Sequence, residues 1–108
     1  MKILGIETSC DETAAAVVED GRKILSNTTA TSAGLHAKTG GVIPEDAARK
    51  QIKAIIPVVN LSLGQAQVKG TDLDAIAVTV GPGLIGSLLV GVETAKTFAY
   101  VWDKPIIA

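Results

Sequence analysis

The segment from Glu7 to Thr13 brings hydroxyl, thiol and carboxylate side chains together at consecutive positions. Its backbone N–H groups and the hydroxyls of Thr8 and Ser9 can bind a phosphate, while Asp11 or Glu12 can hold a cation or its water shell. An ordinary solvated turn has the same composition, because Asp and Ser bond readily to nearby backbone groups. Cys10 is expected to be a buried, inert thiol unless a nearby cation activates it. The residues alone leave the phosphate site and the solvated turn both open.

A second segment, Gly81-Pro82-Gly83-Leu84-Ile85-Gly86, has the form G-x-G-x-x-G between a predicted strand and a predicted helix. In dinucleotide-binding proteins this motif follows the first strand, whereas here three strands and a helix are expected before it. We therefore interpret the glycines as a sharp turn into the helix, with Gly86 and Gly91 permitting close packing. An anion at the helix N-terminus remains an alternative.

His36, Glu45 and Arg49 form a third group, near Gly40-Gly41. One histidine cannot form a metal site alone, since structural sites use about four ligands, so we expect a surface or turn histidine. Glu45 and Arg49 stand four residues apart at the start of a predicted helix, where a weak ion pair is expected. The chain by itself predicts no catalytic dyad.

The elements that position these segments follow from the hydrophobic pattern. Strands are predicted at Lys2–Glu7, residues 13–19 and Lys23–Thr31, with a tight hairpin at Asp20-Gly21. Apolar residues at three- and four-residue intervals through residues 48–63 predict an amphipathic helix. Pro44 lies near its start and Pro57 lies inside it, which we interpret as one kinked helix.

The rest of the chain predicts a strand, a helix and a further strand. Residues 75–80 are apolar on both faces, as in a central parallel strand. Residues 84–100 are predicted to form a helix with a wide apolar stripe, and residues 104–108 to begin the last strand. The order βββαβαβ predicts an α/β fold with a mixed five-stranded sheet flanked by helices, antiparallel on one side and parallel on the other.

Composition excludes several classes of protein. The chain has 108 residues, 47% of them hydrophobic, with 10 basic and 11 acidic side chains and one cysteine. One domain is expected, and neither a disulfide scaffold nor a four-cysteine metal site is available. The net charge of -1 gives no general attraction to nucleic acid. The apolar runs are too short to span a bilayer and the start does not resemble a signal peptide, so we expect a cytoplasmic protein.

Residues 5–13, 36–45 and 80–86, spaced as they are, resemble one family closely. It is the universal family of tRNA threonylcarbamoyladenosine transferases of TsaD type, formerly called the glycoprotease or O-sialoglycoprotein endopeptidase family. The resemblance implies a lobe of the actin-like ATPase (RNase H-like) class, and transfer of a threonylcarbamoyl group from threonylcarbamoyl-AMP to N6 of adenosine 37 in tRNAs that read codons beginning with A.

The resemblance also implies where ligands bind. The turn Thr8, Ser9, Cys10, Asp11, Glu12 would face the phosphates of an adenine nucleotide. The family's divalent metal, iron or zinc, is held by a His-x-x-x-His motif and an Asp that would follow residue 108, so no metal ligand is expected in this segment. Residues 1–108 would then be an N-terminal lobe that ends before the metal motif and is inactive alone. Gln51 stands where many members carry a second histidine, which weakens any role inferred for that position.

The implied partners are tRNA, an inactive paralogue and the small ATPase subunit of the bacterial complex, with no membrane. The second helix is expected to bind a partner through exposed small residues at Gly91, Ala95 and Ala99. Two alternatives remain: a non-catalytic partner-binding lobe of the same fold, and a metallopeptidase as in the older family name. The polar turn at residues 9–12 argues against the first, and the lack of a metal motif argues against the second.

Overall fold

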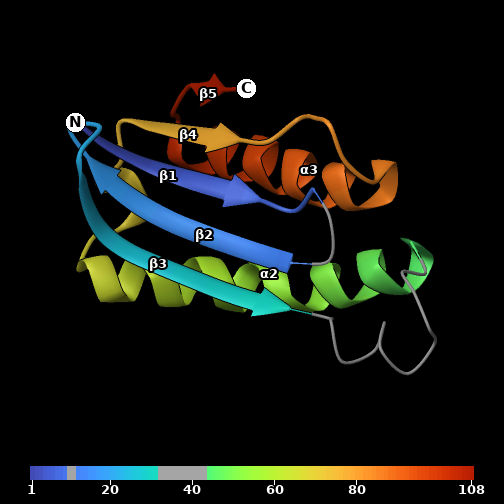
Figure 1. Cartoon of the computed structure of the whole chain (residues 1–108). Helices are drawn as coiled ribbons and strands as arrows, with labels where there is room; N and C mark the ends of the chain where they lie inside the picture. Colours follow the sequence, from blue (N-terminus) through green and yellow to red (C-terminus); the bar gives the residue numbers. More distant parts are fainter. Residues whose placement is uncertain (10–11, 32–43) are drawn as a thin grey trace.

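The structure is a computed structural model that describes residues 1–9, 12–31 and 44–108, without the side chains of residue 31 and residues 44–47. The described strands form one sheet in the order β3-β2-β1-β4-β5, and two helices cover one of its faces (Figure 1). The strands are β1 (Lys2–Glu7), β2 (Glu12–Glu19), β3 (Lys23–Thr31), β4 (Ala75–Val78) and β5 (Ile106–Ile107). The helices are α2 (Pro44–Ala66) and α3 (Ile85–Trp102), with a 3-10 turn, η1 (Gly70–Asp72), before β4.

The sheet is antiparallel on one side and parallel on the other, as predicted. β1 pairs with β2 and β2 with β3 in antiparallel register, whereas β4 pairs in parallel with both β1 and β5. The predicted hairpin is confirmed: Asp20 and Gly21 have φ of 55° and 69°, and the Arg22 amide donates to the Glu19 carbonyl at 3.2 Å. Positive φ at both central positions matches the twist of the two strands.

The core lies between the sheet and the helices. Alternate residues of the central strands face the helices and are buried, namely Leu4, Ile6, Ala15, Val17, Ile76 and Val78. From α2 they meet Ile55 and Val59, which lie one helical turn apart on one stripe. Successive side chains of a strand point to opposite faces of the sheet, so covering one face buries every second residue.

The helix α2 is continuous through Pro57, as one helix was predicted. Pro57 is exposed, so its missing N–H and its ring lie on the solvent side and not against the sheet. On the buried side, Ser62 donates to the Ala15 carbonyl at 3.0 Å and its oxygen lies 2.7 Å from the Ser26 hydroxyl. These paired hydroxyls satisfy polar groups that the core would otherwise leave unbonded.

Two strands are shorter than predicted. β4 ends at Val78 and not at residue 80, because Thr79 makes the last backbone bond to Ile6, at 3.2 Å, before the chain turns toward α3. β5 is confined to Ile106–Ile107 at the edge of the sheet. Neither difference changes the predicted order of the elements.

The prediction that α3 exposes its small residues is wrong, whereas partner binding by this helix stays a prediction. Gly91 is buried and Ala95 is 0% exposed, while Ala99 is partly buried. Small residues occupy this stripe because α3 lies close to β1 and β4, where larger side chains would not fit. The residues that α3 exposes instead are large, notably Ile85 (78%) and Leu89 (53%).

Candidate functional site

The candidate site lies at the edge of the sheet where β1 and β4 end. These strands run in parallel, with Ile6 opposite Val78, while β2 runs antiparallel on the other side of β1. The connections that leave β1 and β4 therefore start at the same edge and touch: the Leu84 amide donates to the Ser9 carbonyl at 2.8 Å. Ligands of open α/β sheets typically bind at the carboxyl ends of strands, where the connections diverge.

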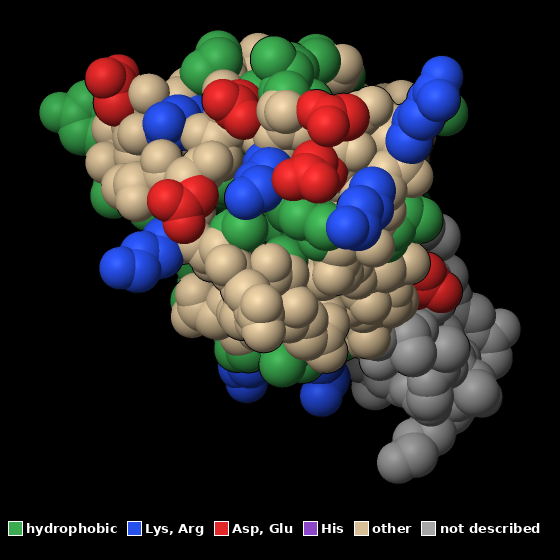
Figure 2. All heavy atoms as spheres, turned by 90° about the vertical axis from the view of Figure 1, so that its left-hand side faces the viewer, with side chains coloured by type: hydrophobic (Ala, Val, Ile, Leu, Met, Phe, Trp, Pro, Cys, Tyr) green, Lys and Arg blue, Asp and Glu red, His purple; other side chains and the backbone are tan. Residues whose placement is uncertain are grey.

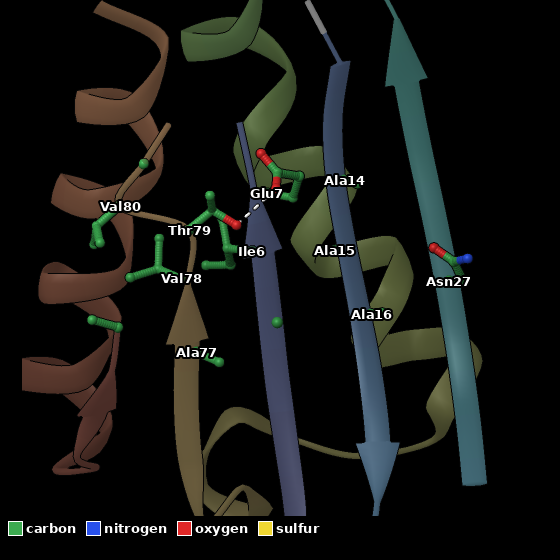
Figure 3. Close-up of a pocket in the computed structure, with 13 residues that line it drawn as sticks. Ile6, Glu7, Ala14, Ala15, Ala16, Asn27, Ala77, Val78, Thr79 and Val80 are labelled. Carbon is green, nitrogen blue, oxygen red and sulfur yellow. Dashed lines mark hydrogen bonds between the residues drawn. The ribbon is translucent and has the colours of Figure 1, made fainter. Parts of the chain in front are cut away.

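Glu7, the last residue of β1, places a carboxylate at this edge. It accepts a hydrogen bond from the Ser9 amide. It accepts another, of 2.7 Å, from the Thr79 hydroxyl, which Figure 3 shows. Partial burial alone would raise the pKa of Glu7, but hydrogen bonds from the hydroxyls of Ser9 and Thr79 and from the Ser9 amide outweigh it and lower the pKa. Glu7 is therefore ionised at neutral pH and held in one orientation.

Thr8 turns the opposite way, into the interior. It is 0% exposed, its hydroxyl donates to the Ser87 carbonyl at 2.6 Å, and the same oxygen accepts from the Gly91 amide at 3.1 Å. The hydroxyl of Thr8 thus bonds the end of β1 to α3. Only the backbone of Thr8 lies near the edge of the sheet where β1 and β4 end. Gly91 is required here, since a Cβ would lie 2.5 Å from the Thr8 oxygen.

The remaining members of the predicted turn fall into two groups. Ser9 is partly buried and follows Thr8, while Glu12 is exposed at the first position of β2. Cys10 and Asp11 lie outside the described residues, so their predicted roles stay predictions. Gln51, which the sequence analysis noted only as a departure from the family pattern, is 1% exposed. Its side-chain amide donates to the carbonyls of Thr8 and Glu12, at the two ends of this turn.

The G-x-G-x-x-G segment acts as the strand-to-helix turn that was predicted. Gly83 passes so close to Ser9 that a Cβ would collide with the Ser9 carbonyl. A Cβ added at Gly86 would lie 3.7 Å from the Ala48 methyl of α2, an ordinary contact distance, so the packing of α3 on α2 does not require glycine at this position. Gly83 is what lets the β4–α3 connection lie against the turn after β1. The alternative of an anion at the N-terminus of α3 stays untested.

The third predicted group contributes less. His36 lies outside the described residues, as does the side chain of Glu45, and Arg49 is exposed on α2. Over the described ranges, no cluster of three or more His, Cys, Asp or Glu side chains could hold a metal ion.

The face of the sheet opposite the helices forms a hollow of about 670 Å³ that leads to this edge. Its floor is made of small residues on adjacent strands: Gly5, Ala14, Ala16 and Ala77. Figure 3 shows the three alanines, with Glu7 and Thr79 at one end of the hollow. Small side chains keep the floor flat, so a planar or extended ligand group can approach the Glu7 carboxylate along it.

Thr79 was missed by sequence reasoning. It lies 72 residues from Glu7 in the chain, and only the parallel pairing of β1 with β4 brings the two together. Its one sequence signal was its place at the end of a predicted central strand.

The surface charge agrees with the composition. In Figure 2, which views the molecule from the left of Figure 1, acidic and basic side chains are interspersed and no patch of one sign forms on that face. This matches a net charge of -1. Among the described residues, no helix is long and apolar enough to cross a membrane.

The mixed five-stranded sheet, with the two described helices on one face, defines an α/β lobe. The chain is similar along its whole length to the solved structure "YeaZ from Pseudomonas aeruginosa", with a TM-score of 0.74 and 24% identity, covering 44% of that chain. At this identity the similarity establishes the fold class alone, and it confirms the fold that was predicted.

Sequence comparison is more specific. The family described as "TsaD: tRNA N6-adenosine threonylcarbamoyltransferase" matches residues 23–108. The tRNA N6-adenosine threonylcarbamoyltransferase of Thermomicrobium roseum is 60% identical over 107 residues, which are 99% of this chain and 29% of the relative. That of Clostridium novyi is 58% identical over 107 residues, 99% of this chain and 31% of the relative. The chain belongs to the TsaD family, as its motifs predicted, and spans about three tenths of the length of these relatives.

Proposed function

We propose that this chain is the N-terminal lobe of a longer enzyme that transfers a threonylcarbamoyl group from threonylcarbamoyl-AMP to N6 of adenosine 37 in tRNAs that read codons beginning with A. The observation that carries the proposal is family membership over residues 23–108, in a chain that covers 29% of its Thermomicrobium relative. A lobe of this size would supply one wall of a nucleotide cleft and depend on the rest of the protein for the other.

The proposed role of this lobe is to hold the nucleotide. The turn from Thr8 to Glu12 would face the phosphates through the backbone of Thr8, the polar groups of Ser9 and the predicted contribution of Cys10. The carboxylates of Glu12 and, as predicted, Asp11 would bind the water shell of a cation beside the phosphates and not the phosphates themselves. Backbone N–H groups of such turns bind phosphate oxygens without adding charge to the protein. The ionised Glu7 would not contact a phosphate directly, because like charges repel; it would orient the Ser9 backbone and accept a hydrogen bond from a ribose or from water.

The family's iron or zinc would be bound outside this chain. The described residues do not fit a metal, since the carboxylate at the edge is already bonded to Thr79 and Ser9 and no cluster of ligands surrounds it. A bound divalent cation would act as a Lewis acid toward the phosphate or the carbonyl of the substrate. The proposed task of Glu7 and its neighbours is to bind and orient, independently of that ion.

The proposed partners are tRNA, an inactive paralogue and a small ATPase subunit, in the cytoplasm, where tRNA is modified. An apolar groove of about 360 Å³ between α2 and α3 supports a protein partner. Exposed Ile52 (62%) and Leu89 (53%) line it. Contiguous exposed apolar residues of this kind mark interaction surfaces.

The activity is tested on the full-length protein with its partner subunits. Purified complex is incubated with threonylcarbamoyl-AMP and tRNA that lacks the modification, and the tRNA nucleosides are then measured by mass spectrometry. The proposal predicts modified adenosine with the complex and none with residues 1–108 alone. A folded, assembled complex that leaves the tRNA unmodified, or that cleaves a glycoprotein instead, would overturn it.

The partner surface is tested by Leu89→Asp, with Ile24→Asp on β3 as the matched control, since Ile24 is 66% exposed away from the groove. We expect Leu89→Asp to abolish co-elution with the paralogue on gel filtration and Ile24→Asp to leave it intact. Co-elution of both folded variants would show that the groove is not the interface.

A further inference from the structure

The face of the sheet opposite α2 and α3 is not covered by any of the described residues (Figure 1). The hollow of about 670 Å³ lies on this face, and of the described residues that line it only Glu7 is charged. Its apolar lining includes Val80, which is 54% exposed. β4 is apolar on both faces and pairs in parallel with β1 and β5, and parallel strands occur almost only where both faces of a sheet are covered. The open face therefore lacks one layer of an α/β fold.

The floor of the hollow is shaped to receive a helix. One row of the floor crosses three neighbouring strands, because Gly5 of β1 lies opposite both Ala16 of β2 and Ala77 of β4. Strands in a sheet are about 4.8 Å apart, so the row is about 10 Å across, close to the ~10–12 Å diameter of a helix with its side chains. A helix on this face would seat its large apolar side chains on these small residues.

Gly5 gives independent support, because nothing within the described residues requires a glycine there. Its φ is not in the left-handed region, and an added Cβ would meet only the Ala16 carbonyl, at 3.9 Å, an ordinary contact distance. At Gly83 and Gly91, by contrast, a Cβ would collide with the turn after β1. A glycine inside a strand weakens the strand and often marks the close approach of another backbone. At Gly5 that backbone must lie outside the described residues.

The part of the polypeptide best placed to cover this face is the one that follows β5. Ile107 of β5 lies opposite Ala77, and Ala108 lines the hollow, so a continuation of the chain starts at the open face. The family has the length for such a continuation, since this chain covers 29% of the Thermomicrobium relative and 31% of the Clostridium relative.

The path of the chain also explains why α2 and α3 leave this face free. α2 precedes β4 and α3 precedes β5, and each leads to a strand further along the sheet in the same direction. Right-handed crossovers that move in one direction place their helices on one face of a sheet. A helix that leads to no further strand of this sheet is free of that constraint and can lie on the opposite face.

We propose that the open face binds a helix from the part of the same polypeptide that follows residue 108, with large apolar side chains seated on Gly5, Ala16 and Ala77. The inference rests on the proposed function, which makes this chain the N-terminal lobe of a longer enzyme. The helix confines any ligand to the end of the hollow where Glu7 and Thr79 are joined by a hydrogen bond of 2.7 Å.

The first test measures access to the face in the isolated full-length protein. Ala16→Cys places a thiol on the floor of the hollow, and Gly64→Cys, on the exposed side of α2, is the control. Both variants are treated with iodoacetamide under native conditions, and the labelled peptides are quantified by mass spectrometry so that other cysteines do not interfere. The thiol at residue 16 is expected to react about a hundredfold more slowly than the thiol at residue 64, since labelling requires local opening.

The second test uses the sign of a stability change in the same full-length protein. On an open face Gly5→Val would raise the Tm, because valine is favoured in strands and its side chain meets no neighbour. Under a helix the added methyl groups overpack the contact, and the Tm is expected to fall by about 3 °C or more. Gly5→Ala should show a smaller fall. Gly64→Ala, the control, should not lower the Tm, because nothing lies within 4 Å of its Cβ position.

The inference is overturned if the thiol at residue 16 reacts as fast as the control, or if Gly5→Val raises the Tm. Protection that appears only after the partner subunits are added would assign the face to another protein, and protection that appears only with threonylcarbamoyl-AMP would assign it to a ligand; each overturns the inference. Neither test needs activity. If the complex transfers no threonylcarbamoyl group, the proposed function fails, and labelling and Tm still decide what covers the sheet.

Discussion

Gly91→Ala should destabilise the protein although alanine is the better helix former. An added Cβ would lie 2.5 Å from the hydroxyl oxygen of Thr8, well inside contact distance. Thr8 cannot rotate away without loss, because it is fully buried and its hydroxyl bonds to the Ser87 carbonyl and the Gly91 amide. The substitution must therefore move α3 outward or break these hydrogen bonds.

The magnitude follows from three contributions. Adding a methylene group to a packed core costs about 1–3 kcal/mol. Each hydrogen bond lost from Thr8 costs about 0.5–1.5 kcal/mol. The greater helix propensity of alanine returns about 1 kcal/mol. The net loss in the free energy of unfolding is thus expected to be ~2–3 kcal/mol.

The assay is equilibrium urea unfolding followed by far-UV circular dichroism, with Gly64→Ala as the control. Gly64 also lies in a helix, but nothing lies within 4 Å of its Cβ position, so this change should stabilise the protein by up to ~1 kcal/mol. In a Thr8→Ala background the hydroxyl is gone, and Gly91→Ala should become nearly neutral. A cost that is the same in both backgrounds, or a stabilising Gly91→Ala, would refute the proposed contact.

Three further predictions concern other contacts. Thr79→Val should raise the pKa of Glu7, which lies below its ordinary value of 4.5 in the folded protein. The stability that Glu7 contributes is present above pH 4.5 and is lost as the pH falls through the folded pKa, so the variant should lose less stability on acidification. A carbon NMR titration that shows an unchanged pKa of Glu7 would contradict this. Ser62→Ala should cost about 1–3 kcal/mol in urea unfolding, because it leaves the Ala15 carbonyl and Ser26 with fewer buried partners, whereas a neutral effect would mean that water replaces the hydroxyl. Ala95→Asp should prevent folding, as judged by lost near-UV dichroism, because the position is 0% exposed; a folded variant would mean that α3 can move off the sheet.

Local elements were predictable because their signals are local. The strands at Lys2–Glu7 and Lys23–Thr31 have the predicted bounds, and Asp20-Gly21 supplies the positive φ values of the hairpin. α2 could be recognised through Pro57 because its buried stripe recurs at helical spacing on both sides of the proline. The order of these elements then left few ways to arrange the sheet.

The orientation of α3 could not be predicted in the same way. Its large apolar residues suggested the buried side, yet Leu89 is 53% exposed and the buried stripe is Ser87, Gly91 and Ala95. The reason is steric: the end of β1, with the buried Thr8, comes so close to α3 that only small residues fit between them. The spacing of apolar residues indicates that a helix has an apolar side, but it does not indicate how close the neighbouring strand lies.

The sequence by itself determined the family, the order of the strands and helices, and the turn in which polar groups concentrate, because each depends on residues close together in the chain. The tertiary structure alone decided what those polar groups do. It turned Thr8 inward to α3, paired Glu7 with Thr79, and placed Gln51 across both ends of the turn. These contacts join residues from distant parts of the chain, and hydrogen bonds between such residues depend on distances that only the packed sheet and helices define.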